Sequence, residues 1–266
     1  MPIFVETLKQ NWKQILYWGI GLGLLGFLMM VILPDVKILE QYAEVLGSFP
    51  PEVLDAIGIS DASYLASPDG FIAFGFFSYS ILILAAYAVI MGMRVTANEE
   101  DEGILDIVLS HPVPRWRLVV EKVLAFSLIF ILVIEMGLLG LAIGMPFSAF
   151  DINVDSLIAN TISLIPPVLL MLLITVFIGT VVRRRTIAIA LASFVMVFMY
   201  FIDLLGASVT DSILDKLRFV SVFRYYDPQL IMKDGLNPES MILLSTVALL
   251  MLLASIFVFQ RRDINL

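Results

Sequence analysis

The segment FIAFGFFSYSILILAAYAVIMGM, residues Phe71–Met93, decides the fold class, because none of its 23 residues carries a charge. A helix needs about 20 apolar residues to cross the hydrocarbon core of a bilayer. A helix of this length also satisfies its backbone hydrogen bonds internally, as lipid requires. The segment therefore predicts a membrane-spanning helix.

The composition of the whole chain agrees with this prediction. Its 266 residues are 60% hydrophobic and 15% charged, with a mean hydropathy of +0.99. Soluble domains carry roughly 45–50% apolar and about 25% charged residues. We therefore expect an all-α integral membrane protein. The net charge of −8 gives no reason to expect nucleic-acid binding, which calls for clustered basic residues.

Five further stretches are long and apolar enough to span the bilayer. They are Ile15–Leu33, Val123–Met145, Leu157–Val182, Ile187–Gly206 and Ser240–Phe259. Together with Phe71–Met93 they predict six transmembrane helices in a single transmembrane domain over residues 1–266.

The distribution of Lys and Arg predicts the orientation. The two chain ends, segment 94–122 and the turn at 183–185 carry eleven of the 16 basic residues, and the remaining segments carry five. Lys and Arg in short loops are retained in the cytoplasm. Both termini are therefore expected to be cytoplasmic, in a multi-pass protein of the plasma membrane. Segments 34–70, 146–156 and 207–239 would face outside.

The residues before the first span have an amphipathic pattern. Phe4, Leu8, Trp12 and Ile15 recur near helical spacing, with polar residues between them. The pattern predicts a short N-terminal helix lying in the cytoplasmic interface of the membrane. The alternative is that these residues are the polar flank of the first span.

The first and third outer loops are also expected to contain short helices. In the first outer loop, Val36–Leu46 has helical apolar spacing, and Pro50-Pro51 can open a second helix over Glu52–Ile57. In the third, we expect these aromatic side chains to pack at the outer interface: Phe219, Phe223, Tyr225 and Tyr226.

Several catalytic motifs are absent. No glycine is followed by lysine, so the chain has no Walker A phosphate loop. It has no cysteine and a single histidine, His111, which removes thiolate and multi-histidine metal sites. We therefore expect no catalytic residue, cofactor or metal site, and no ATP hydrolysis by this chain.

The glycines of two spans predict close helix packing. Gly21-x-Gly23-x-x-Gly26 matches the dinucleotide-binding pattern, but that function needs a preceding strand and an aqueous phosphate site. Inside a span, these glycines and Gly19 instead predict a small-residue face, and Gly140 and Gly144 predict another. The pattern leaves open whether the contacts form within one chain or between two.

Glu135 lies near the middle of the third span. A charge at that depth costs about 2.5–3.5 kcal/mol on insertion scales, so the side chain should face protein or water. One interpretation is that it lines a translocation pathway. The other is a structural hydrogen bond to a neighbouring helix, with Asn160 or Thr161 as the partner.

Segment 98–122, NEEDEGILDIVLSHPVPRWRLVVEK, is the densest cluster of charge in the chain. Asn98 is a favourable N-cap, and acidic residues fill the first helical turn after it. Ile104, Leu105 and Leu109 share one helical face, and Pro112 ends the helix. An acidic surface helix with one apolar side fits a groove in a soluble protein better than it fits anionic lipid. A solvated loop on the headgroups is the alternative.

Here the chain resembles the permease subunits of ABC-2 type transporters. Their first cytoplasmic loop reads E-x-E-x-G-T-L-E-x-L-L-S-x-P-V-S-R, followed by a lysine near the next span. The matching residues are Glu99, Asp101, Gly103, Leu105, Asp106, Leu109, Ser110, Pro112, Val113, Arg115 and Lys122. Ile104 and Pro114 depart from the pattern. Three more stretches are similar to the family: PEVLDAIG at 51–58, SVFRYYDP at 221–228 and FQRRDI at 259–264.

The resemblance implies an assembly and a mechanism. Two permease subunits, in a homodimer or heterodimer, would form the pathway through the lipid, and two ATP-binding subunits would dock below them. Segment 99–111 would be the coupling helix, and transport would mostly be export. The residues implied in ATPase coupling are Glu99, Glu100, Asp101, Gly103, Leu105, Leu109 and Arg115.

Two other functional classes stay open at this point. A secondary transporter or channel would need no ATPase, but it would depend on intramembrane charge, for which Glu135 is the deep candidate. A polytopic assembly or sensor protein would transport nothing.

Overall fold

The computed structural model describes residues 2–32, 41, 44–45, 47–50, 53, 64, 67–95, 114–148, 150, 152–182, 184–208 and 213–261. Within these ranges the regular structure is helical, with no strand. Six helices of the described part are long and apolar enough to cross a membrane, which confirms the predicted number of spans.

The spans are formed by long helices in chain order. The first is α1, Pro2–Ile32, and the second consists of α5, Pro68–Ile72, the π-helix η1, Ala73–Ser78, and α6, Tyr79–Met93. The remaining four are α9 (Arg115–Gly144), α10 (Val154–Val181), α11 (Arg185–Ser208) and α14 (Pro238–Arg261). The shorter elements are η2 (Met145–Phe147), α12 (Ile213–Leu217), η3 (Arg218–Val220), η4 (Phe223–Tyr225) and α13 (Pro228–Asp234). Residues 207–239, called here loop 3, therefore contain short helices, as the sequence predicts. The helices predicted for residues 34–70, called here loop 1, fall largely outside the described residues.

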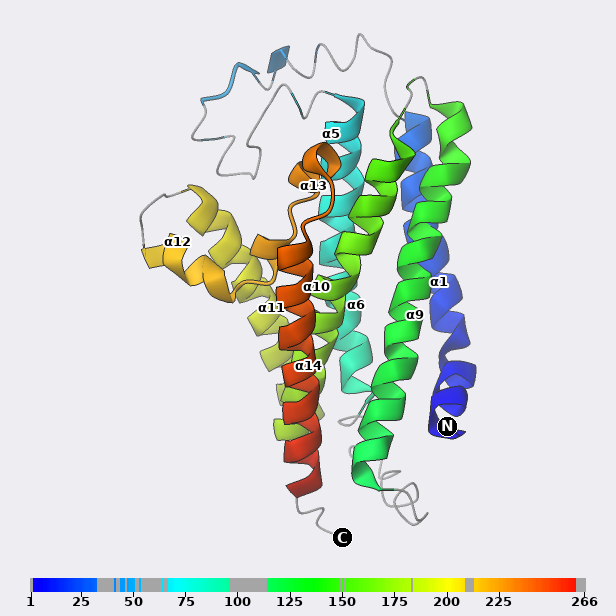
Figure 1. The fold of residues 1–266 in the computed structure, drawn as a ribbon, viewed down its shortest axis with the longest axis vertical. Coiled ribbons are helices and arrows are strands. Elements are labelled where there is room, and N and C mark those ends of the chain that lie inside the picture. Colours follow the sequence, from blue (N-terminus) through cyan, green and yellow to red (C-terminus); the bar gives the residue numbers. More distant parts are fainter. Residues whose placement is uncertain are drawn as a thin grey trace.

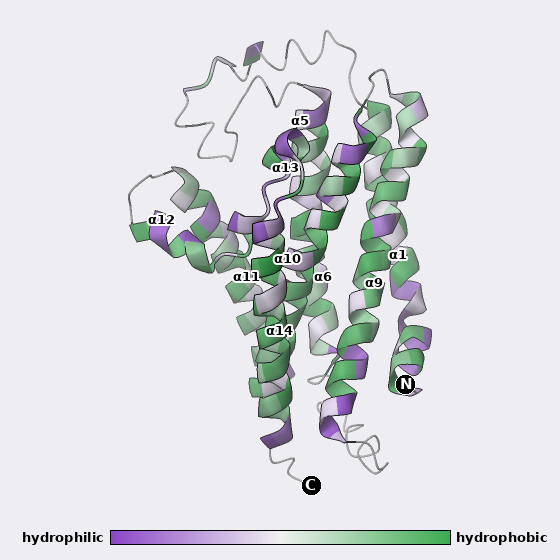
Figure 2. Cartoon of the chain, in the orientation of Figure 1, coloured by the Kyte–Doolittle hydropathy of each residue, from purple (hydrophilic) through white to green (hydrophobic). Residues whose placement is uncertain are grey.

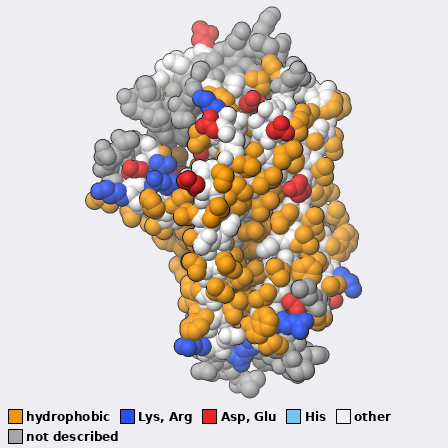
Figure 3. All heavy atoms as spheres, in the orientation of Figure 1, with side chains coloured by type: hydrophobic (Ala, Val, Ile, Leu, Met, Phe, Trp, Pro, Cys, Tyr) orange, Lys and Arg blue, Asp and Glu red, His pale blue; other side chains and the backbone are white. Residues whose placement is uncertain are grey.

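The spans form an elongated bundle around α10, which is the most buried of the six. α10 packs against α6, α9, α11 and α14, and α1 lies on the outer side of α9 (Figure 1). α1 begins and α14 ends at the same end of the bundle, called here the terminal end, while α5 and α13 lie at the opposite end (Figure 1). Hydrophobic residues dominate the length of the spans, and apolar side chains cover the middle of the visible face (Figures 2 and 3). This distribution suits a bundle surrounded by lipid.

The prediction of a separate N-terminal interfacial helix is wrong. Residues 2–32 form one uninterrupted helix. Thr7 and Asn11 are buried in the same helical stripe as Leu22 and Gly26, which face α9, whereas Trp12 is half exposed. The polar start of the helix is therefore held against the bundle, and no proline or glycine between Pro2 and Gly19 interrupts it.

Glycines allow α1 and α9 of the same chain to approach closely. A Cβ added at Gly140 would collide with the backbone carbonyl of Gly23. A Cβ at Gly26 would lie 2.9 Å from the Gly137 carbonyl oxygen, and one at Gly144 would lie 2.6 Å from the Met30 Cβ. Small residues at such contacts let helix backbones pack directly in lipid.

Gly21 does not belong to this packing face, contrary to the prediction from its spacing. A Cβ at Gly21 would have no neighbour within 4 Å. The reason is the helical period, since a residue two positions from Gly19 and Gly23 points away from the side on which those two lie.

The second span contains a π-helical segment, Ala73–Ser78, that the sequence did not predict. The Ser78 hydroxyl donates a hydrogen bond to the Ala73 carbonyl, five residues earlier, over 3.2 Å. Phe76 and Phe77 of this segment are almost completely buried, and α13 packs against it. The segment changes the helical register between α5 and α6.

Candidate functional site

The segment predicted to contact an ATPase lies mostly outside the described residues. This applies to Glu99, Glu100, Asp101, Gly103, Leu105 and Leu109. The structure does describe both flanks, Arg94-Val95 after α6 and Pro114-Arg115 at the start of α9. Arg115 is the first residue of α9 and is half-buried. Its role in coupling stays a prediction.

The flank after α6 is held by hydrogen bonds from two basic side chains, its own Arg94 and Lys122 of α9. The Arg94 guanidinium donates from Nη1 to Asn11 Oδ1 of α1, over 2.9 Å. Lys122 of α9 donates from Nζ to the Val95 carbonyl oxygen, over 3.3 Å. The end of the second span is therefore connected to both α1 and α9.

Near its start, α9 is bound to α1 through Glu121. Its carboxylate accepts a hydrogen bond from the backbone N–H of Phe4, over 3.0 Å, and forms an ion pair with Arg117. Phe4 belongs to the first turns of α1, whose early N–H groups have no partner within the helix. Glu121 therefore serves as the acceptor that this helix end lacks.

The contacts between α1 and α9 keep one register over most of their length. Phe4 binds Glu121, 117 positions later. Gly23 meets Gly140, and Gly19 meets Met136, at the same separation of 117. A constant separation means that the two helices run parallel and do not diverge between these contacts. Sequence analysis missed this register because it joins residues that are far apart in the chain.

Glu135 is half-buried in α9, and within the described part of the chain no hydrogen bond or ion pair reaches its carboxylate. Both partners proposed for it are engaged elsewhere. The Asn160 side chain binds residues of loop 3, and the Thr161 hydroxyl donates to the Leu157 carbonyl of its own helix. Among the described residues, the interhelical hydrogen bond of the second interpretation is therefore not formed, and the role of Glu135 in a pathway stays a prediction.

The opposite end of the bundle is closed by loop 3, which is anchored on Asn160. This side chain is fully buried and donates from Nδ2 to the Pro228 carbonyl oxygen, over 3.0 Å. Its Oδ1 accepts a hydrogen bond from the Tyr226 hydroxyl, over 3.3 Å. Burial raises the pKa of Tyr226 well above its ordinary value, so the hydroxyl remains a donor at physiological pH.

Tyr64 lies close to α13. The Lys233 ammonium is 5.6 Å from the centre of its ring. Burial raises the pKa of Tyr64 to about 12, and the charges of Asp69, Asp227 and Asp234 act in the same direction. The phenol is therefore neutral at physiological pH. Among the described residues, no group of acidic, histidine or cysteine side chains is placed to hold a metal ion.

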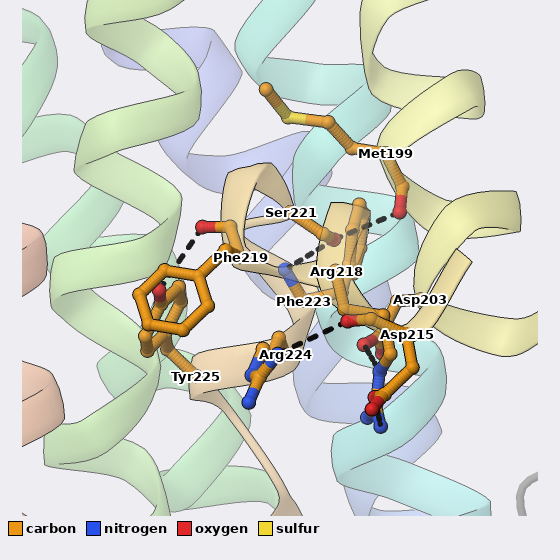
Figure 4. A network of polar contacts seen from close by, with 9 residues as sticks. All are labelled: Met199, Asp203, Asp215, Arg218, Phe219, Ser221, Phe223, Arg224 and Tyr225. Atoms are coloured by element: carbon orange, nitrogen blue, oxygen red, sulfur yellow. Dashed lines mark hydrogen bonds and ion pairs between the residues drawn. The ribbon is translucent and has the colours of Figure 1, made fainter. Parts of the chain in front are cut away.

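A polar network attaches the start of loop 3 to α11 (Figure 4). Arg218 forms an ion pair with Asp203 of α11 at 3.0 Å and a second with Asp215 at 3.6 Å. The Ser221 hydroxyl donates to the Met199 carbonyl oxygen, over 2.8 Å. Sequence patterns did not predict the pairing of Arg218 with Asp203, because the two residues belong to different elements.

The aromatic residues expected in loop 3 belong to the same region. Phe219 and Tyr225 meet edge to face, and the Tyr225 hydroxyl donates to the Phe219 carbonyl oxygen. Phe223 packs against Tyr200 of α11. The contact of Phe223 packs loop 3 against α11.

Comparison with protein families matches residues 8–264 to a model described as ABC-2 family transporter protein. The chain belongs to the ABC-2 transporter family. Comparison with curated proteins finds no match. As an ABC-2 permease it is a multi-pass membrane protein of a family that lacks ATPase activity, and such permeases generally pair with ATP-binding subunits.

Proposed function

We propose that this chain is the permease subunit of an ATP-driven exporter in the plasma membrane, with both termini in the cytoplasm. Two permease subunits would form the translocation pathway, and two separate ATP-binding subunits would supply the energy. The observation that carries the proposal is segment 99–115, in which Glu99, Asp101, Gly103, Pro112 and Arg115 match the family's cytoplasmic loop within a chain of this family.

The surroundings of the segment support a role in coupling. The flank after α6 is hydrogen-bonded to α1 and α9, and α9, which follows the segment, binds α1 through Glu121, so a displacement of the segment would act on three spans at once. The excess of Lys and Arg at this end supports its placement in the cytoplasm, where ATP is available.

The exposed side of α11 supports a second permease subunit. α11 is among the least buried spans. Large apolar residues alternate at spacings of four and three along its exposed side: Ile187, Leu191, Phe194, Phe198, Phe201 and Leu205. This is the spacing by which two helices pack as a coiled coil. A second copy of this chain is the simplest partner, because both copies would present the same apolar side of α11.

Charge reversal in the coupling segment tests the proposal. We expect Glu99→Lys with Asp101→Lys to abolish ATP hydrolysis by the assembled transporter, because the acidic start of the helix would no longer fit its partner. Co-purification of the ATP-binding subunit should fall by about tenfold or more, while the permease still inserts into the membrane.

Glu239→Lys is the matched control. It reverses an exposed acidic residue at the opposite end of the bundle, and it should leave both the ATPase rate and the co-purification unchanged. Full ATPase activity in the Glu99/Asp101 double variant would refute the proposed coupling role of this segment.

A further inference from the structure

The terminal end of α9 contains two adjacent ionisable residues that are almost fully buried. Glu121 is 3% exposed and Lys122 is 6% exposed. Burying a charge is costly unless hydrogen bonds compensate it. Two buried charged residues are therefore weak evidence that their role is to stabilise the fold. Their position beside the coupling segment indicates a different use.

The two side chains bind different neighbouring helices. Lys122 donates to the Val95 carbonyl oxygen, just after the second span ends at Met93. Glu121 accepts from the Phe4 N–H of α1 and pairs with Arg117 of its own helix. Two consecutive residues near the start of α9 therefore connect this helix to the end of the second span and to α1.

The third connection joins α6 to α1 directly. Arg94 donates to Asn11, and Asn11 donates from its own Nδ2 to the Thr7 carbonyl, over 2.8 Å. Asn11 is 8% exposed, so this contact is also sheltered from water. The three helices α1, α6 and α9 are thus connected pairwise by buried or partly buried polar contacts.

We infer that Glu121 and Lys122 are positioning residues that convert displacement of the coupling segment into a joint movement of α1, α6 and α9. The inference rests on the proposed function. Through Lys122, a movement of the end of α6 displaces the start of α9. Through Glu121, the movement of α9 displaces α1. The constant register between α1 and α9 then carries the movement toward the opposite end of the bundle.

Distance measurements on the assembled transporter test this inference. The chain has no cysteine, so Lys9→Cys and Gln260→Cys introduce two unique sites at exposed positions of the terminal ends of α1 and α14. The permease is labelled with nitroxides before assembly with the ATP-binding subunit, and unlabelled permease is added in excess. Electron-spin distances are then compared in lipid nanodiscs without nucleotide and after trapping with Mg-ATP and vanadate.

We expect the unsubstituted protein to show a shift in this distance on trapping. Lys122→Met removes the donor and Glu121→Met removes the acceptor, and each should reduce the shift by about threefold or more while the ATP-binding subunit remains bound. Lys122→Arg, which keeps a cationic donor, should restore it. Lys13→Met removes an exposed cation of α1 at the same end, and it should leave the shift unchanged.

Three outcomes would overturn the inference. A full shift in Lys122→Met would refute the role of Lys122 while leaving the proposed function intact. If that variant does not assemble, Asn11→Ala decides, because it removes the acceptor of Arg94 along with the donor to the Thr7 carbonyl, and a full shift there would refute the connection. No ATP-dependent shift in the unsubstituted complex would refute the proposed function together with the inference.

Discussion

An added methyl group should have different effects at two glycines, Gly140 of α9 and Gly21 of α1. Gly140→Ala would place a Cβ against the Gly23 carbonyl, which can yield only if the two helices separate. Such overpacking typically costs about 1–3 kcal/mol. We therefore expect a lower midpoint of thermal unfolding for the purified permease in detergent. Gly21→Ala is the control, because its Cβ would meet no atom within 4 Å. Equal midpoints for the two variants would contradict the contact.

Residue types predicted the glycine contact but not the polar contacts at the terminal end. Spacing alone indicated that Gly19 and Gly23 share a face, because helical geometry fixes which residues lie together. The burial of Thr7 and Asn11 depends on helices much later in the chain, and no local pattern reports it. The partners of Glu121 and Lys122 were hidden for the same reason.

Among the elements, α13 offers a clear test, since Asn160 connects it to α10. Asn160→Ala would remove the acceptor of the Tyr226 hydroxyl and the donor to Pro228. A buried polar group left without its partner costs about 1–3 kcal/mol, so residues 226–234 should exchange amide hydrogens about tenfold faster. Mass spectrometry of the exchanged peptides measures this rate.

Thr161→Val is the control for that experiment. Its hydroxyl binds only within α10, to the Leu157 carbonyl, so its removal should leave exchange in α13 unchanged. Equal exchange of α13 in the Asn160 and Thr161 variants would show that Asn160 does not anchor loop 3.

Hydropathy predicted the existence of every span, but it did not predict where the first helix begins or where the second changes its hydrogen-bond pattern. A run of about 20 apolar residues has no alternative to a helix in lipid, so six spans followed directly. The joining of residues 2–14 to α1 and the π-helix at Ala73–Ser78 depend on which neighbours each segment meets. No local pattern reports those neighbours.

At the scale of the whole molecule, the proposed orientation can be measured with single cysteines. Lys9→Cys lies on the exposed surface of α1, and Leu236→Cys lies on the exposed loop between α13 and α14. In intact cells, a membrane-impermeant maleimide should label position 236 and not position 9, because the basic ends stay in the cytoplasm. Permeabilised cells should label at both positions. The reverse pattern in intact cells would place the termini outside.

The continuous pairing of α1 with α9 has a consequence for the lipid around the protein. Helices of 31 and 30 residues are each about 46 and 45 Å long, whereas the hydrocarbon core is about 30 Å thick. Neither helix can adjust by sliding along the other, since their glycine backbones interlock at a fixed register. In a thinner membrane both would have to tilt together, as one rod. Acyl-chain length would then set the resting angle of this rod.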